Sequence, residues 1–272
     1  MKHSVESFDG TKIAYDLKRY SDKFFLVFLH GAGGNYGAWN KVRDLFHKKK
    51  VSTLAIDLRG HGFSARPKNS KDYCLDNFAK DVDTVLNKES IKNFAIIGHC
   101  FGGMVAMMYE KNFPKKSSSY IFIDTSHKAP KALKVIFKIN PLFEAINRLS
   151  PTKSNKNFFH VNYENFVGSG DWNFKRIYSD MIRTTFVSWI RTFNAVSKFE
   201  GKPILEIISQ PSLVVVGDKD TIFNVNVSKK VAELIKGCEF EIAKGENHVI
   251  VLNNPGIVYE KTFNFLEKKG FI

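Results

Sequence analysis

Six short apolar segments recur along the 272-residue chain, and helical or irregular sequence separates each from the next. These segments are Phe24–Leu29, Thr53–Ile56, Phe94–Ile97, Tyr120–Ile123, Leu213–Val216 and Phe240–Ala243. Continuous runs of Val, Ile, Leu and Phe are typical of strands that helices cover on both faces, as in a parallel sheet. Intervening stretches such as Leu75–Leu86 and Val227–Ile235 repeat their apolar residues at helical spacing. The alternation therefore predicts an α/β fold with a mostly parallel central sheet flanked by helices.

The first residues predict a β-hairpin ahead of this alternation. Val5–Phe8 and Thr11–Tyr15 flank the dipeptide Asp9-Gly10, which is typical of tight hairpin turns.

The alternation stops between residues 126 and 202. This stretch holds many aromatic residues and Pro130, Pro141 and Pro151, with helix-like segments but no strand-like run. We predict that it is a helical cap inserted into an α/β core of residues 1–125 and 203–272. It carries nine lysines and four arginines against three glutamates and two aspartates, which is more than half of the net charge of +14.

The positive charge allows two interpretations. Either the basic cap attracts anionic small molecules, or its lysines are ordinary solvated surface. A nucleic-acid-binding protein is not expected, because no basic stripe has aromatic or recognition-helix context. No apolar stretch approaches the roughly 18 residues of a membrane span, and residues 1–6 lack the apolar centre of a signal peptide. We therefore expect a cytoplasmic protein without a membrane span.

Cysteine usage agrees with that expectation. Cys74, Cys100 and Cys238 are too few and too scattered for a disulfide framework, and none has metal-ligand spacing. The sequence implies neither a metal nor a cofactor, and it leaves the oligomeric state open.

The pentapeptide Gly98-His99-Cys100-Phe101-Gly102 follows an apolar strand and precedes a helix-forming stretch. Strand, tight turn and helix together are the setting of a nucleophile elbow, here with cysteine at the central position. The flanking glycines allow close approach of neighbouring elements around a strained central residue. At the first turn of a helix, the dipole and the unpaired N–H groups favour a thiolate. Cys100 is therefore a candidate nucleophile.

A second glycine-rich turn, His30-Gly31-Ala32-Gly33-Gly34, follows the first strand of the alternation. Such a turn can point backbone N–H groups into a site at the carboxyl end of the sheet. We expect the N–H groups of Ala32 and Phe101 to form an oxyanion hole, and His30 to brace the turn. Asp57 and Arg59, after the next strand, are expected to hold loops together by charge-assisted hydrogen bonds.

An acid and a base follow the last two strands. Gly217-Asp218-Lys219-Asp220 offers two carboxylates that could orient a histidine, and we favour Asp220, three residues after the glycine. His248, in Gly245-Glu246-Asn247-His248, lies on the loop after the last strand and is the candidate general base.

The order Cys100, Asp220, His248 resembles the α/β-hydrolase superfamily, in which nucleophile, acid and histidine follow in this order. Matching motifs are the His30-Gly31 turn, Asp57-x-Arg59-Gly60-His61-Gly62-x-Ser64, Gly98-x-Cys100-x-Gly102, Gly217-x-x-Asp220 and Gly245-x-x-His248. The cysteine at the elbow is similar to that of dienelactone hydrolases and of polyhydroxyalkanoate synthases and depolymerases. The resemblance implies an acyl hydrolase, a carboxylesterase or thioesterase, that uses a Cys-His-Asp triad on a small-molecule acyl substrate.

Two alternatives remain open at this level. An acyltransferase could use the same thioester intermediate with an alcohol or amine as acceptor, and a basic cap could attract an anionic carrier such as coenzyme A. A non-catalytic ligand-binding relative would usually lack a triad member. Aromatic cap residues that could line the substrate pocket, or serve only in packing, are Phe158, Phe159, Trp172, Phe186 and Trp189.

Overall fold

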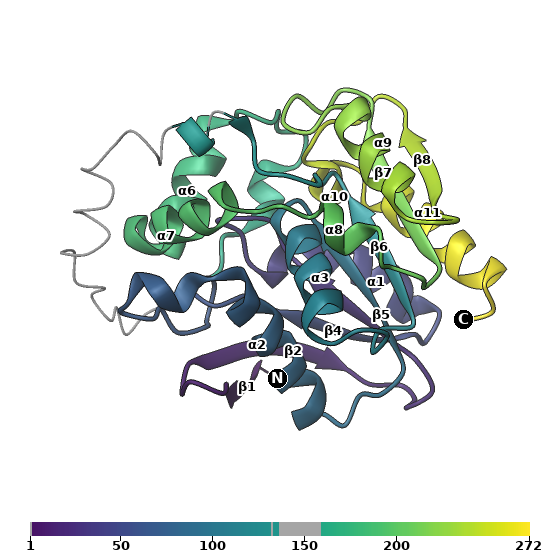
Figure 1. Cartoon of the computed structure of the whole chain (residues 1–272), viewed down its shortest axis with the longest axis horizontal. Helices are drawn as coiled ribbons and strands as arrows, with labels where there is room; N and C mark the ends of the chain where they lie inside the picture. The colour runs from purple at the N-terminus through teal and green to yellow at the C-terminus, as the bar shows by residue number, and fades with distance from the viewer. Residues whose placement is uncertain (1, 132, 136–158) are drawn as a thin grey trace.

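A computed structural model describes residues 2–131, 133–135 and 159–272 of the chain. Within them, eight strands form one sheet between two layers of helices (Figure 1). The strands are β1 (Lys2–Glu6), β2 (Lys12–Lys18), β3 (Phe25–Leu29), β4 (Ser52–Ile56), β5 (Phe94–His99), β6 (Ser119–Ile123), β7 (Ser212–Gly217) and β8 (Glu239–Ala243). Each of the six apolar segments of the sequence is one of these strands, and the predicted α/β fold is confirmed.

The strand order explains where a site can form. The sheet runs β1-β2-β4-β3-β5-β6-β7-β8, with β2 antiparallel to both of its neighbours, β1 and β4, and every pair from β4 to β8 parallel. Strand β3 thus lies between β4 and β5, and Leu29 pairs with Gly98 in register. The chain leaves β3 and β5 side by side at the carboxyl edge of the sheet, which is where open α/β folds place their ligands.

Two helical layers cover the sheet. One face packs against α2 (Leu75–Lys88), α3 (Phe101–Asn112), α8 (Lys202–Leu205) and α9 (Val225–Leu234). The other packs against α1 (Asn40–Lys48), α10 (Ile250–Asn253) and α11 (Pro255–Lys268). Strands β3 to β7 are buried along their whole length, because apolar side chains meet helices on both faces.

The hairpin differs in detail from its prediction. Glu6 pairs with Lys12, so β1 ends before Ser7 and the turn is five residues wide instead of two. Side-chain contacts explain the wider turn: the Ser7 hydroxyl donates to the buried Asp81, and Asp9 accepts a hydrogen bond from Arg59. Gly10 still supplies the positive φ that the turn requires.

The sequence between β6 and β7 contains η3 (Tyr163–Phe166), α6 (Phe174–Thr184) and α7 (Phe186–Ser197). Lys128 and Glu200, near its two ends, form an isolated antiparallel bridge. Pro141, Pro151 and Phe158 lie outside the described residues. Among the helices that the structure describes, none is both long and apolar enough to cross a bilayer.

Candidate active site

Cys100 has the backbone conformation of a nucleophile elbow. It lies between β5 and α3 with φ 53° and ψ −113°, a strained conformation for a residue with a side chain. The glycines around it are sterically required: a Cβ on Gly98 would lie 2.5 Å from the Gly102 carbonyl, and one on Gly102 would lie 2.1 Å from the Leu29 carbonyl oxygen. Cys100 is partly exposed.

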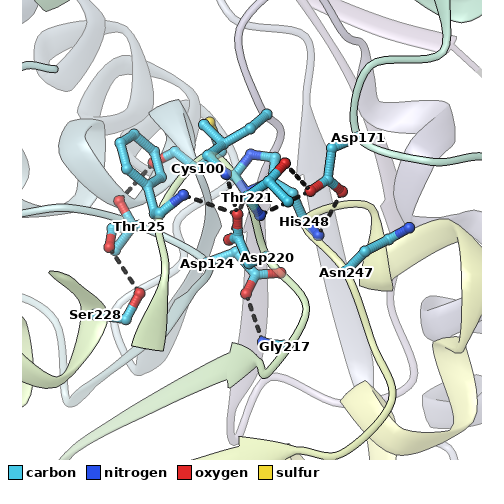
Figure 2. Close-up of polar contacts among 12 residues, drawn as sticks. Cys100, Asp124, Thr125, Asp171, Gly217, Asp220, Thr221, Ser228, Asn247 and His248 are labelled. Carbon is cyan, nitrogen blue, oxygen red and sulfur yellow. Dashed lines mark hydrogen bonds and ion pairs between the residues drawn. The ribbon is translucent and has the colours of Figure 1, made fainter. Parts of the chain in front are cut away.

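The structure brings Cys100, His248 and Asp220 together, as the sequence predicts (Figure 2). His248 Nδ1 lies 2.8 Å from Asp220 Oδ2, and both side chains are buried. Asp220 Oδ1 accepts hydrogen bonds from the backbone N–H groups of Ile222 and Phe223, at 2.7 and 2.8 Å. The acid is therefore fixed, and its second oxygen orients the imidazole with Nδ1 protonated and Nε2 available to Cys100.

The electrostatics of His248 favour its protonated form. Burial alone would lower the pKa of His248, but the charge of Cys100 and the hydrogen bonds with Asp220 and Cys100 raise it well above its ordinary value. The imidazolium is thus stabilised when Cys100 is a thiolate, which is the nucleophilic form of a cysteine.

Asp218, the alternative acid, lies elsewhere. Its side chain is exposed and Oδ1 accepts a hydrogen bond from Gly245 N–H at 2.7 Å. It therefore joins the two loops at the surface and does not contact the imidazole ring of His248 in any described interaction.

The turn after β3 lies beside the elbow. A Cβ placed on Gly31 would be 3.5 Å from the Cys100 Cβ. Gly33 N–H donates to His61 Nε2 at 3.1 Å and Gly34 N–H donates to the Gly31 carbonyl. Among the described residues, the N–H groups of Ala32 and Phe101 donate no hydrogen bond. Both N–H groups that the sequence predicts as oxyanion donors are therefore unpaired among the described residues.

Two buried neutral histidines fix this turn. Burial lowers the pKa of His30 to about 4 and that of His61 well below its ordinary value. His30 Nε2 accepts from Leu58 N–H, while its Nδ1 is 2.8 Å from the Gly31 carbonyl oxygen. His30 thus braces the turn, as predicted.

Asp57 and Arg59 also agree with their predicted structural roles. Asp57 accepts from the N–H groups of Tyr36 and Phe63 and from His160 Nε2 at 2.7 Å. The buried Arg59 forms two hydrogen bonds with Asp81, at 2.6 and 2.7 Å. Neither side chain is among the groups that contact the triad.

Sequence reasoning missed His99 and Asp124. His99 Nε2 donates to the His248 carbonyl at 2.8 Å, and burial together with the His248 charge lowers the pKa of His99 to about 3. Asp124, directly after β6, accepts from Gly217 N–H through Oδ1, whereas its buried Oδ2 has no partner among the described residues. Burial and the Asp220 charge raise the pKa of Asp124 well above its ordinary value, against the opposing charge of His248. The sequence feature that could have identified Asp124 is its position directly after the predicted strand Tyr120–Ile123.

Three of these groups could in principle hold a metal ion. The ligand atoms of His99, Asp124 and His248 lie within 4.8 Å of one another. One ring nitrogen of each imidazole bonds within the site, His248 with Asp220 and His99 with the His248 carbonyl. Metal-ligating histidines commonly make such bonds through their second nitrogen, so these contacts fit a metal ion as well as a catalytic triad.

The aromatic residues between β6 and β7 differ in position. Trp189 lies against the oxyanion turn, since a Cβ on Gly33 would be 3.3 Å from its ring. Phe159, Trp172 and Phe186 are exposed, although Trp172 Nε1 donates to the hydroxyl of Thr221, next to Asp220, at 3.0 Å.

Comparison with known proteins supports the architecture. The solved structure of a thermophilic esterase from Thermogutta terrifontis superimposes with a TM-score of 0.78, 17% identity and 98% coverage of both chains. An esterase from Exiguobacterium antarcticum gives a TM-score of 0.78, 17% identity and coverage of 98% of this chain and 100% of that one. A protein of Mycoplasma pneumoniae called "Putative esterase/lipase 2" is 26% identical over 95% of each chain.

The sheet order, the elbow after β5 and the placement of Asp220 and His248 after the last two strands define an α/β-hydrolase architecture. The model of the alpha/beta hydrolase fold family matches residues 25–255, and the chain belongs to that family.

Proposed function

We propose that the protein is an acyl hydrolase, a carboxylesterase or thioesterase, that uses Cys100, His248 and Asp220 through a thioester acyl-enzyme. The observation that carries the proposal is the partly exposed cysteine at the elbow, beside a histidine that a buried carboxylate orients. The name of the Mycoplasma pneumoniae relative and the activities of the two solved esterases agree with this class.

The first half-reaction forms the thioester. The Cys100 thiol proton passes to His248, and the sulfur attacks the carbonyl carbon of the substrate. The carbonyl oxygen becomes an oxyanion that the Ala32 and Phe101 N–H groups stabilise. When the tetrahedral intermediate collapses, the bond to the leaving alcohol or thiol breaks and His248 donates its proton to that group.

The second half-reaction releases the acid. His248 takes a proton from water, and the resulting hydroxide attacks the thioester carbonyl. Collapse of this intermediate breaks the C–S bond and releases the carboxylic acid, and the sulfur recovers its proton from His248. Asp220 holds the imidazole in one tautomer throughout and stabilises each imidazolium.

We also propose that residues 126–202 act as a cap over the site. Thr184, at the end of α6, donates to the Gly33 carbonyl at 2.6 Å, and Trp189 of α7 packs on the same glycine. These contacts support a role for the segment in shaping the acyl pocket. A thiol nucleophile is easily oxidised, and the three described cysteines are all free, which favours the cytoplasm as its compartment.

The test compares two cysteines that both precede a helix. Cys100 precedes α3, and the exposed Cys74 precedes α2. Hydrolysis of short p-nitrophenyl esters is measured for wild type, Cys100→Ala and Cys74→Ala. We expect Cys100→Ala to lose at least about 10³-fold in kcat/KM and Cys74→Ala to keep its rate. Equal rates in all three proteins would refute the proposal.

A further inference from the structure

We propose that Asp171 is a positioning residue for the catalytic histidine, supplied by the segment between β6 and β7. The inference rests on the proposed function, since it assigns Asp171 to the arrangement of that triad. It gives the inserted segment a part in catalysis that is separate from covering the substrate.

The geometry joins two loops through one carboxylate. Asp171 Oδ1 accepts the backbone N–H of His248 at 2.8 Å. Asp171 Oδ2 accepts the backbone N–H of Thr221 at 2.8 Å and its hydroxyl at 2.7 Å. Thr221 directly follows the acid Asp220, so the two oxygens hold the histidine and the acid loop together (Figure 2).

Burial makes these hydrogen bonds stronger than surface contacts. The Asp171 side chain is buried, so water does not compete for its hydrogen bonds, and hydrogen bonds are stronger in a low-dielectric interior than in water. The three donors satisfy the carboxylate and at the same time fix the main chain of His248.

Asp171 is itself held from both directions. Arg176 Nη2 donates to the Asp171 carbonyl at 2.7 Å. The carbonyl of Ser169 accepts from the side-chain amides of Asn247 and Asn253, each at 3.0 Å. Gly168 N–H donates to Asn253 Oδ1 at 2.7 Å. The segment that carries Asp171 is thus docked on the histidine loop, and the carboxylate has a defined position.

The loops that carry Asp220 and His248 need a further contact to fix them, because the sheet ends before both residues. The pairing of β7 with β8 ends at Gly217 and Ala243, so Asp220 and His248 lie on loops beyond the ladder. A displacement of about 1 Å at a catalytic group can cost about 10²-fold in rate. A buried carboxylate that bonds to both loops limits that displacement.

The test pairs Asp171→Asn with Asp218→Asn. Both aspartates join the loop that carries Asp220 to the loop that carries His248. Asp218, however, lies outside residues 126–202, its side chain is exposed, and it bonds to Gly245 instead of His248. An asparagine at position 171 places an NH₂ group against one of the donors and loses that hydrogen bond. Two readouts are measured: kcat and KM on a p-nitrophenyl ester, and the rate at which iodoacetamide alkylates Cys100 at pH 7, resolved by peptide mass analysis.

For Asp171→Asn we expect kcat to fall about 10- to 100-fold with KM within about twofold, because the nucleophile–base geometry changes and the pocket does not. Alkylation of Cys100 should slow about tenfold, because a displaced imidazole stabilises the thiolate less. Asp218→Asn should leave both within about twofold. Unchanged kcat and alkylation in Asp171→Asn, or a rise in KM at constant kcat, would overturn the inference.

A second variant tests the inference if Asp171→Asn does not fold. Thr221→Val keeps the Asp171 bond to His248 but removes one of the three donors, and with it the oxygen that accepts from Trp172 Nε1. We expect about a threefold loss in kcat and in alkylation rate. No loss in either would count against the inference. Alkylation does not depend on ester turnover, so the two proposals can fail separately. If the wild type hydrolyses no ester but Asp171→Asn is alkylated more slowly, the proposed function is refuted and the positioning role of Asp171 stands.

Discussion

The elbow and the segment between β6 and β7 hold the same site by different means. At the elbow the contacts are between main chains: Gly98 and Gly102 allow α3 to lie against β3 and β5 with no room for a Cβ. In the β6–β7 segment the contacts are made by buried polar side chains, among them Asp171, Asp180 and Thr184.

This difference has a physical consequence. A glycine contact depends on close packing and is insensitive to pH, whereas a buried carboxylate depends on its partners and on its ionisation. Substitutions that add volume should therefore disrupt the elbow, whereas substitutions or pH changes that alter charge should affect the segment between β6 and β7.

The largest expected effect is a difference in kcat/KM between substitutions of Asp220 and Asp124, the two carboxyl groups beside His248. Asp220→Asn should lower kcat/KM about 10³-fold, which corresponds to about 4 kcal/mol, because an amide NH₂ facing Nδ1 favours the wrong tautomer. Asp124→Asn should change kcat/KM less than about threefold, because a carboxyl whose pKa is raised well above its ordinary value resembles a neutral amide. Steady-state kinetics measure both, and equal losses would show that the two groups share one role.

The next largest effect is on the free energy of unfolding, for a glycine-to-alanine substitution made in each of the two regions. Gly102→Ala should lower the free energy of unfolding by about 3 kcal/mol, because its Cβ would meet the Leu29 carbonyl at 2.1 Å. Gly170→Ala, where no heavy atom lies within 4 Å of the new Cβ, should change it by less than about 1 kcal/mol. Urea unfolding measures both. A tolerated Gly102→Ala would contradict the close approach of α3 and β3.

The smallest effect concerns pH. Burial raises the pKa of Asp180 to about 7, against the opposing effects of Arg176 and of the hydrogen bond from Tyr163. The folded protein then holds this proton more tightly than the unfolded chain does. The contribution of Asp180 to the free energy of unfolding should accordingly fall as pH rises from about 4 to about 7, by about 4 kcal/mol in all and about 2.5 kcal/mol above pH 5, and stay constant above pH 7.

Asp180→Asn cannot ionise and should remove this part of the pH dependence, whereas the exposed Glu164→Gln, in the same segment, should keep it. Thermal unfolding between pH 5 and 8 measures the three proteins. Identical pH profiles for wild type and Asp180→Asn would show that Asp180 does not titrate in this range.

The sequence was sufficient to predict the strands, the elbow, the oxyanion turn and the meeting of Cys100, Asp220 and His248. These features depend on local patterns, an apolar run followed by glycine or by a single polar residue, and parallel strands bring such positions to one edge. The hairpin turn was misjudged, because the Ser7–Asp81 contact that widens it joins residues far apart in the sequence.

Asp124 and Asp171 could not be assigned from the sequence for a related reason. A single aspartate after a strand or within an irregular segment is usually a cap or a surface residue. Their roles appear only when Gly217 N–H meets Asp124, and when the N–H groups of His248 and Thr221 converge on Asp171.

The most direct test of the central claim is to trap the acyl group. Wild type is mixed with a p-nitrophenyl ester, quenched in acid within the first turnover, and analysed by intact mass and by peptide mapping. The account predicts one acyl group, on the peptide that contains Cys100, released by hydroxylamine as a thioester and absent from Cys100→Ala. Turnover with the acyl group on another residue, or with none on Cys100 while Cys100→Ala keeps its rate, would contradict it.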